Sequence, residues 1–117
     1  MLGLNGKKAI VTGAGGGIGR EICARLAAVG CDIALFDIDS EAANSVANSL
    51  KGVTTSVHKV DVADYEAVGQ VVAEAIAALG GLHILINNAG WDIAQPFIET
   101  EPGFWDKVIA INYKGPL

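Results

Sequence analysis

Short apolar runs alternate with amphipathic helical patterns along this chain, and the alternation limits the folds it can adopt. The first run, Ala9-Ile10-Val11-Thr12, is rich in β-branched residues and stops at a glycine. Such a run is typical of a strand buried on both faces. Similar short runs cover residues 33–36, 53–60 and 83–86. The sequence therefore predicts four strands separated by helices.

The first helix is expected to begin near Ile18 and to stop at Gly30, a residue that readily ends a helix. Its apolar positions recur at helical spacing, so they are expected to face the sheet together. These positions are Ile18, Ile22, Leu26 and Val29.

Two further helices have acidic or hydroxyl residues at their expected starts. Asp39 or Ser40 can cap a helix that runs to about Leu50. Asp64 can cap the next, which Gly80-Gly81 ends. Its apolar face contains Val68, Val71, Val72, Ala75, Ile76 and Leu79. After an irregular loop, Thr100 can cap a last helix that contains Trp105, Val108, Ile109 and Asn112.

This order of elements predicts an α/β fold. Helical connections impose parallel strand pairing with right-handed crossovers, which favours a doubly wound parallel sheet of the Rossmann type. The usual strand order of such sheets is 3-2-1-4. The strand over residues 83–86 then lies at one edge of the sheet.

Composition and charge exclude several classes of protein. The 117 residues are 51% hydrophobic and 18% charged, which excludes disorder as the bulk state. The net charge is −5 and the basic residues are scattered, so a nucleic-acid partner is not expected. No apolar run is long enough to span a membrane, and the charges near the N-terminus follow the apolar residues, unlike those of a signal peptide. Cys23 and Cys31 fit buried free thiols in a reducing cytoplasm, and no metal site is expected.

The glycine-rich segment Thr12-Gly13-Ala14-Gly15-Gly16-Gly17-Ile18-Gly19 lies between the first strand and the first helix. Glycine is also the usual turn residue, so a glycine-rich turn alone is weak evidence for a site. At this position, however, unpaired N–H groups at the helix start face an anion, and the helix dipole favours negative charge. Residues without a Cβ let a pyrophosphate approach the backbone closely. The segment therefore predicts a dinucleotide-binding turn.

The glycines are spaced as TGxxxGxG, through Gly13, Gly17 and Gly19, and this spacing resembles that of the short-chain dehydrogenase/reductase family. Other segments carry the same resemblance in the same order. They are Asp61-Val62 after the third strand, Asn87-Asn88-Ala89-Gly90 after the fourth, and Asn112 with Gly115 in the last helix.

Asp37 ends the second strand, where a carboxylate can accept hydrogen bonds from the hydroxyls of an adenosine ribose and repel a 2′-phosphate. Alternatively, Asp37 only closes the strand. The resemblance implies that members preferring NADP carry a basic residue after the first glycine or after this acid, where this chain has Ala14 and Ile38. NAD is therefore the expected cofactor.

The resemblance implies further cofactor contacts. Asp61 would bond the adenine amino group, although it fits a turn residue as well, and Val62 would offer its backbone N–H to the ring. Asn87 is expected to be structural, bonding backbone across the sheet. The resemblance places the remaining cofactor contacts, beyond the glycines and Asp37, at Ile18, Asn88, Ala89 and Gly90.

The family's catalytic residues are an Asn, a Ser, a Tyr and a Lys four positions after the Tyr. Only the first has a match, Asn112. Tyr113 and Lys114 are adjacent and cannot form the pair, and Tyr65 has Gly69 at the required position. Residues 1–117 are therefore expected to be a dinucleotide-binding domain that stops before the Ser and the Tyr-x-x-x-Lys, and to be inactive alone. His58 and His83 are expected to be structural.

The resemblance implies hydride transfer between NAD and a secondary alcohol or ketone, in a homo-oligomer, dimeric or tetrameric. Trp91-Asp92 and the segment around Trp105 resemble 2-hydroxycyclohexanecarboxyl-CoA dehydrogenases, which suggests a CoA thioester substrate. A 3-oxoacyl-thioester reductase and a non-catalytic nucleotide-binding module remain alternatives. A methyltransferase using S-adenosylmethionine would lack the Asn-Asn-Ala-Gly segment and Asn112.

Overall fold

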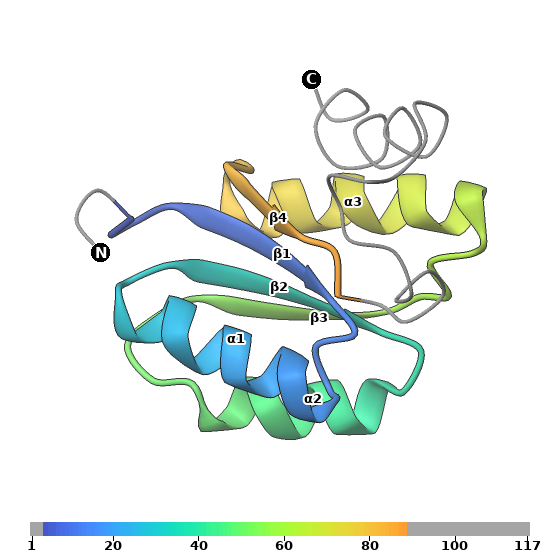
Figure 1. The fold of residues 1–117 in the computed structure, drawn as a ribbon. Coiled ribbons are helices and arrows are strands. Elements are labelled where there is room, and N and C mark those ends of the chain that lie inside the picture. The colour runs from blue at the N-terminus through green and yellow to red at the C-terminus, as the bar shows by residue number, and fades with distance from the viewer. Residues whose placement is uncertain (1–3, 89–117) are drawn as a thin grey trace, which may run out of the picture.

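The computed structural model describes residues 4–88, which form a four-stranded parallel sheet flanked by three helices (Figure 1). The strands are β1 (Lys8–Thr12), β2 (Asp32–Asp37), β3 (Thr55–Lys59) and β4 (Ile84–Ile86), and the helices are α1 (Gly17–Ala28), α2 (Ser40–Ser49) and α3 (Tyr65–Leu79). The strand order is β3-β2-β1-β4. The predicted fold class and strand order are therefore confirmed.

The register of the sheet brings the carboxyl ends of its strands to one edge. Thr12 of β1 lies opposite Phe36 of β2, and Asp37 lies opposite Lys59 of β3. On the other side, Val11 of β1 lies opposite Ile86 of β4. Because all pairs are parallel, the segments that leave these four ends emerge on the same side of the molecule.

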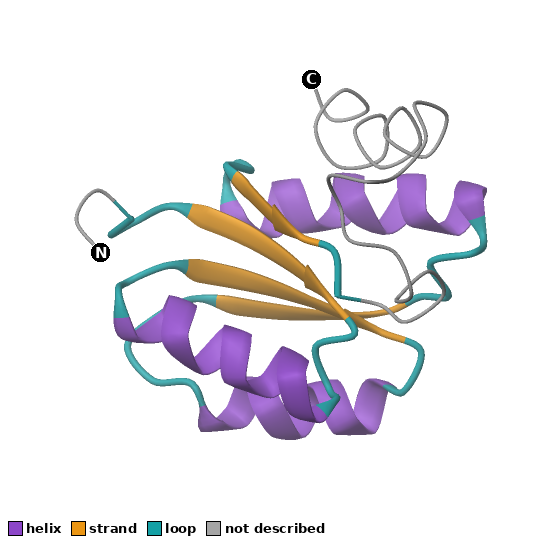
Figure 2. Ribbon diagram, viewed as in Figure 1, coloured by secondary structure: helices purple, strands orange, loops and turns teal. Residues whose placement is uncertain are grey.

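The helices cover both faces of the sheet: α1 and α2 lie against one, and α3 lies against the other (Figure 2). Alternate strand residues point to opposite faces. Val11, Ile33 and Leu35 pack with α1 and α2, whereas Ile10 and Phe36 pack with α3. Burial on both faces explains why the runs in β1 and β2 are continuously apolar.

The predicted inner face of α1 is partly wrong. Ile22 and Leu26 pack against the core, but the side chain of Ile18 is 71% exposed. The buried line of this helix runs through Gly19 and Cys23 instead. Two small residues let α1 approach the sheet closely, which turns Ile18 toward the surface.

The starts of α2 and α3 are as predicted. The side chain of Asp39 accepts a hydrogen bond from the Ala42 N–H, and that of Asp64 accepts one from the Ala67 N–H, both at 3.1 Å. Each bond satisfies one of the backbone donors that a helix start leaves free. Gly80 ends α3 in the left-handed conformation, with φ +85°.

Cys23 and Cys31 are free and fully buried, as predicted. Burial raises the pKa of the Cys23 thiol to about 11, so this thiol is protonated and unreactive at neutral pH. Within residues 4–88, no helix combines the length and apolar character that crossing a membrane requires. No group of three or more potential metal ligands occurs in the same part of the chain.

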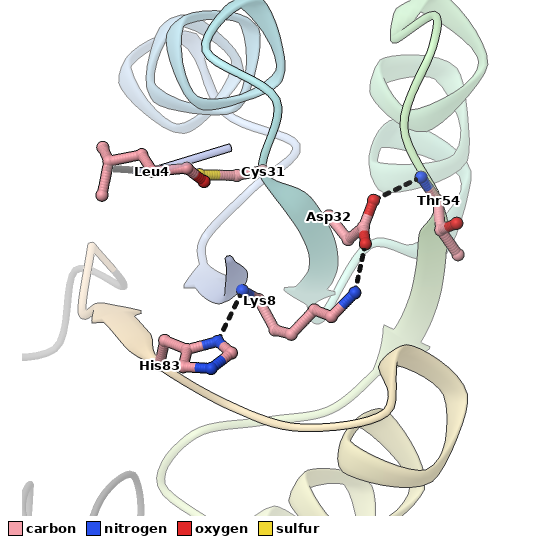
Figure 3. A network of polar contacts seen from close by, with 6 residues as sticks. All are labelled: Leu4, Lys8, Cys31, Asp32, Thr54 and His83. Atoms are coloured by element: carbon pink, nitrogen blue, oxygen red, sulfur yellow. Dashed lines mark hydrogen bonds and ion pairs between the residues drawn. The ribbon is translucent and has the colours of Figure 1, made fainter. Parts of the chain in front are cut away.

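A polar network connects the strands at their amino ends, which lie opposite the glycine-rich segment that follows β1 (Figure 3). The Lys8 ammonium lies 2.5 Å from Asp32 Oδ2, and the Thr54 N–H donates to Asp32 Oδ1 at 2.8 Å. These contacts, led by the hydrogen bond from Lys8, lower the pKa of the Asp32 carboxyl. The Lys8 N–H also donates to His83 Nδ1 at 2.9 Å, so His83 has the predicted structural role.

His58, the other histidine, connects the edge strand β3 to α3. Its ring packs edge-on against Phe36, with 5.4 Å between ring centroids, and its Nε2 lies 2.9 Å from the Ser56 hydroxyl. Its Nδ1 lies 3.5 Å from a carboxylate oxygen of Glu74. These contacts are structural, as predicted, although the sequence pattern suggests no carboxylate partner for His58.

Candidate functional site

Four segments leave the carboxyl edge of the sheet, and together they form the candidate site. They are residues 13–19 after β1, residues 37–39 at the end of β2, residues 60–64 after β3 and residues 87–88 after β4. These segments hold eight of the ten cofactor-binding residues predicted from the sequence. Ala89 and Gly90, and also Asn112, lie outside the described residues.

The turn between β1 and α1, residues 13–16, is called the glycine loop below. Gly13 has φ +63°, a conformation that residues with a Cβ rarely adopt. The Gly16 N–H donates to the Gly13 carbonyl at 3.2 Å, which closes the turn. At Gly19, an added Cβ would collide with the same carbonyl. Gly13 and Gly19 are therefore required by the fold itself.

Gly17 differs, because a Cβ added there would meet no atom within 4 Å. The described chain gives no steric reason for glycine at this position. The backbone N–H groups of Gly17, Ile18 and Gly19 also have no acceptor among residues 4–88, and the first bond of the helix runs from the Arg20 N–H to the Gly16 carbonyl at 2.8 Å. Open space beside three free donors at a helix start suits an anion.

Asp37, half-buried at the end of β2, faces the glycine loop. Its Oδ2 accepts a hydrogen bond from the Gly15 N–H at 2.7 Å, and its Oδ1 accepts one from the Asp39 N–H at 2.9 Å. The next side chain, Ile38, is 64% exposed. Among the described residues, no lysine or arginine forms an ion pair with Asp37.

Asp61 and Val62 follow β3 in a turn that adjoins β2. The Val60 N–H donates to the Asp37 carbonyl at 3.0 Å, which fixes the turn beside the end of β2. The side chain of Asp61 is exposed and accepts a hydrogen bond from the Ala63 N–H at 2.9 Å, as a turn residue would. Val62 is half-buried and packs against the cluster beneath α3.

Asn87 and Asn88 are held to the end of β1 through Thr12. The Thr12 hydroxyl lies 3.1 Å from Asn87 Oδ1 and accepts from the Asn88 N–H at 2.8 Å. Asn88 Nδ2 donates to the Gly13 carbonyl at 3.4 Å. Asn87 therefore bonds across the sheet as predicted, but its partner is a side-chain hydroxyl, because β1 presents Thr12 at that position.

Two loop residues escaped the sequence prediction, Gly15 and Gly16. A Cβ on Gly15 would lie 2.7 Å from the Cβ of Ala42 in α2, so the loop and the start of α2 are in close contact. Gly16 is the N-cap of α1. The TGxxxGxG pattern accepts any residue at positions 15 and 16. Only the unbroken run of glycines from 15 to 17 indicates that these two positions belong to the site.

The site combines two kinds of recognition. The start of α1 offers backbone donors and the positive end of a helix dipole to an anion. Asp37 offers carboxylate oxygens whose remaining lone pairs can accept from hydroxyl groups. The bond between Asp37 and Gly15 joins these two elements, so one ligand carrying both a phosphate and a sugar diol fits the arrangement.

Comparison with known proteins agrees with this geometry. Residues 7–117 match the model of a family described as short chain dehydrogenase. A short-chain dehydrogenase/reductase from Armillaria gallica is 36% identical over 115 residues, which are 94% of this chain and 44% of that protein. The galactitol 2-dehydrogenase (L-tagatose-forming) of Cereibacter sphaeroides is 38% identical over 112 residues, 96% of this chain and 44% of that protein.

A solved structure is similar as well. The crystal structure of an NAD⁺-bound xylitol dehydrogenase superposes with a TM-score of 0.73 at 36% identity, covering 97% of this chain and 45% of that one. The chain thus spans less than half the length of each of these three proteins.

Proposed function

Since the chain belongs to the short-chain dehydrogenase family, we propose that it forms the dinucleotide-binding part, residues 1–117, of an NAD-dependent oxidoreductase. The reaction is hydride exchange between the nicotinamide and a secondary alcohol or ketone. The observation that carries the proposal is the link between the open start of α1 and the carboxylate of Asp37 through the Gly15 N–H.

Each segment of the site has a task in holding the dinucleotide. The N–H groups of Gly17, Ile18 and Gly19 would receive the pyrophosphate, and the absence of a Cβ on Gly17 allows close approach. Asp37 would accept hydrogen bonds from the adenosine ribose. Asp61 and the Val62 N–H would hold the adenine. Asn88, Ala89 and Gly90 would line the floor beneath the cofactor.

The preference for NAD over NADP follows from charge. A 2′-phosphate would stand beside the Asp37 carboxylate, and Ala14 and Ile38 offer it no cation. Asp39 and Glu41 add further negative charge at the start of α2. The NAD⁺ in the xylitol dehydrogenase structure supports the same choice.

When bound, the cofactor supplies a hydride acceptor or donor at its nicotinamide. The protein must then hold and move a proton at the substrate oxygen. Among residues 1–117, the family resemblance assigns only Asn112 to this catalytic group, and no tyrosine has a lysine four positions later. We place the Ser and the Tyr-x-x-x-Lys in the remainder of the protein and expect no turnover from residues 1–117 alone.

The substrate class rests on the relatives and on one short segment of the sequence. Galactitol and xylitol dehydrogenases act on polyols, which supports a secondary alcohol. Trp91-Asp92 favours the narrower choice of a hydroxyacyl-CoA such as 2-hydroxycyclohexanecarboxyl-CoA, with a 3-oxoacyl-thioester as the alternative. We further propose a cytoplasmic homo-oligomer, either a dimer or a tetramer.

Two measurements on the full-length protein test this function. Calorimetry with NAD determines whether the site binds the dinucleotide, and NADH absorbance with polyols and hydroxyacyl-CoA thioesters determines turnover. Asn112→Ala is the matched variant, expected to keep NAD affinity and lose most activity. Binding without turnover on any substrate would support a non-catalytic nucleotide-binding module, and an absence of NAD binding would refute the proposal.

A further inference from the structure

Asp37 makes a contact that recognition of a ribose does not require. Its Oδ2 accepts a hydrogen bond from the Gly15 N–H at 2.7 Å, across 22 positions of sequence. The bond joins the end of β2 to the middle of the glycine loop. A hydrogen bond from a backbone N–H to a carboxylate is charge-assisted and therefore among the stronger kinds.

Other contacts around this bond hold the same part of the loop. The Ala14 N–H donates to the Phe36 carbonyl at 3.1 Å, one residue before both partners of the bond. The Cα of Gly15 faces Ala42 so closely that a Cβ would not fit. Asp37 itself is fixed by the bond from the Asp39 N–H to its Oδ1. The Asp37 carboxylate thus connects the start of α2, through its Oδ1, to the glycine loop, through its Oδ2.

These bonds leave acceptor capacity for a ligand. An ionised carboxylate has about four lone-pair positions, and the two backbone donors occupy one on each oxygen. Two positions remain for the hydroxyls of a ribose. Asp37 therefore can bind a sugar diol without releasing the loop.

We infer that Asp37 is a positioning residue for the pyrophosphate site: by bonding the Gly15 N–H, it sets the shape of the glycine loop that precedes the anion-binding N–H groups of α1. The inference rests on the proposed function for the identity of the ligand. The bond that carries it lies entirely within the protein. Substituting Asp37 should consequently weaken binding of the phosphate part as well as of the ribose part.

The test asks whether substituting Asp37 raises or lowers the affinity of the protein for inorganic diphosphate. This anion has no ribose, so a residue that only recognises ribose would not help to bind it. Removing a nearby negative charge should in fact strengthen anion binding. If Asp37 shapes the loop, Asp37→Ala in the full-length protein instead lowers diphosphate affinity, by about three- to tenfold for the loss of one such hydrogen bond.

Asp39→Ala is the matched control. It removes a carboxylate two residues away, and the cap of α2, but leaves the acceptor of the Gly15 N–H in place. Diphosphate affinity should then stay equal or rise. Equal or higher affinity in Asp37→Ala as well would overturn the inference.

Amide hydrogen exchange in the wild-type protein gives a second measurement that needs neither a ligand nor a variant. The Gly15 N–H should exchange at least about tenfold more slowly than the Gly17 N–H, which has no acceptor among the described residues. Equal exchange at the two glycines would overturn the inference even if Asp37→Ala did not fold. Slow Gly15 exchange in a protein that fails to bind NAD would refute the proposed function and leave the positioning role intact.

Discussion

The Thr12 hydroxyl accepts a hydrogen bond from the backbone N–H of Asn88 at 2.8 Å. This bond joins the end of β1 to the residues that follow β4, the neighbouring strand in the sheet. Thr12 is only 4% exposed, whereas Asn87 and Asn88 are half-buried. The shorter of the two bonds that hold Asn88 beside the proposed cofactor site is therefore made to a buried hydroxyl.

Thr12→Val should destabilise the protein and weaken NAD binding together. The substitution keeps the shape of the side chain but leaves the Asn88 N–H without its acceptor, which costs about 1–3 kcal/mol of unfolding free energy. Denaturant unfolding and calorimetry would measure the two effects. Thr12→Ser keeps the hydroxyl and is the control. If Thr12→Val bound NAD as tightly as Thr12→Ser, Asn88 would not need this anchor.

Gly17 and Gly19 should respond to alanine in opposite ways. At Gly19 a Cβ collides with the Gly13 carbonyl, so Gly19→Ala should cost about 1–3 kcal/mol or more of unfolding free energy. At Gly17 the added Cβ meets no atom of residues 4–88 within 4 Å, so Gly17→Ala should leave stability unchanged or raise it by up to ~1 kcal/mol.

The NAD affinity of Gly17→Ala should nevertheless fall by at least about tenfold, because the methyl group occupies the space through which the pyrophosphate approaches. Thermal unfolding and calorimetry on the same preparation would separate the two quantities. An unchanged affinity would mean that the phosphates lie elsewhere.

The wild-type protein should bind NAD at least about tenfold more tightly than NADP, a difference of about 1.4 kcal/mol. The reason is the Asp37 carboxylate, which forms no ion pair with a lysine or arginine within residues 4–88. Asp37→Ala combined with Ile38→Arg should narrow or reverse this ratio, although the loss of the Gly15 bond would lower both affinities. Calorimetric titration with each cofactor measures the ratio, and equal wild-type affinities would contradict the role given to Asp37.

Much of this architecture could be predicted from the sequence because strong local rules act on it. Strands β1 and β2 are buried on both faces, which forces unbroken apolar runs. Asp39 and Asp64 occupy N-caps, where their short side chains reach the backbone N–H three residues on. Gly13 is required by its positive φ, and Gly19 by a collision that only glycine avoids.

The rest depends on contacts between segments that are distant in sequence. Periodicity counts large apolar residues, so it placed Ile18 in the core, whereas the close approach of α1 is made by Gly19 and Cys23. Likewise, the bonds of Asp37 to Gly15 and of Lys8 to Asp32 join residues more than twenty positions apart. Only the assembled sheet brings those partners together.

The ion pair of Lys8 and Asp32 should make stability depend on pH in the acid range. The folded protein lowers the pKa of the Asp32 carboxyl, so its ionised form is favoured by folding. The contribution of this ionised carboxyl to the unfolding free energy is complete above its pKa in the unfolded chain, about 3.9. It is lost as the pH falls through the lower pKa of the folded protein. Asp32→Asn should therefore reduce the unfolding free energy by about 1–2 kcal/mol at neutral pH, and by progressively less below pH of about 4.

Denaturant unfolding at a series of pH values measures this difference. Glu21→Gln is the control, because Glu21 and Arg25 form an exposed pair 3.7 Å apart, for which little effect is expected at any pH. A difference between wild type and Asp32→Asn that did not change with pH would show that the charge of Asp32 is not the cause.

The last prediction concerns the outer edge of β4. Within residues 4–88, β4 pairs only with β1, and its residues Ile84, Leu85 and Ile86 are half-buried, in contrast to the fully buried Ile10 and Val11. Natural sheet edges are usually protected by charge, proline or a bulge, and the three residues of β4 provide none of these. An unprotected apolar edge offers backbone donors and acceptors to another chain.

Residues 1–117, expressed alone, should consequently self-associate through this edge at micromolar concentrations. Sedimentation velocity over a range of concentrations measures the association, and the full-length protein is the control, since the three relatives compared are more than twice as long as the matched segment. We expect a sedimentation coefficient that rises with concentration for residues 1–117, whereas the full-length protein forms one defined oligomer. A compact monomer of residues 1–117 at all concentrations would mean that the β4 edge is protected, because a free apolar edge in a parallel sheet is a template for further pairing.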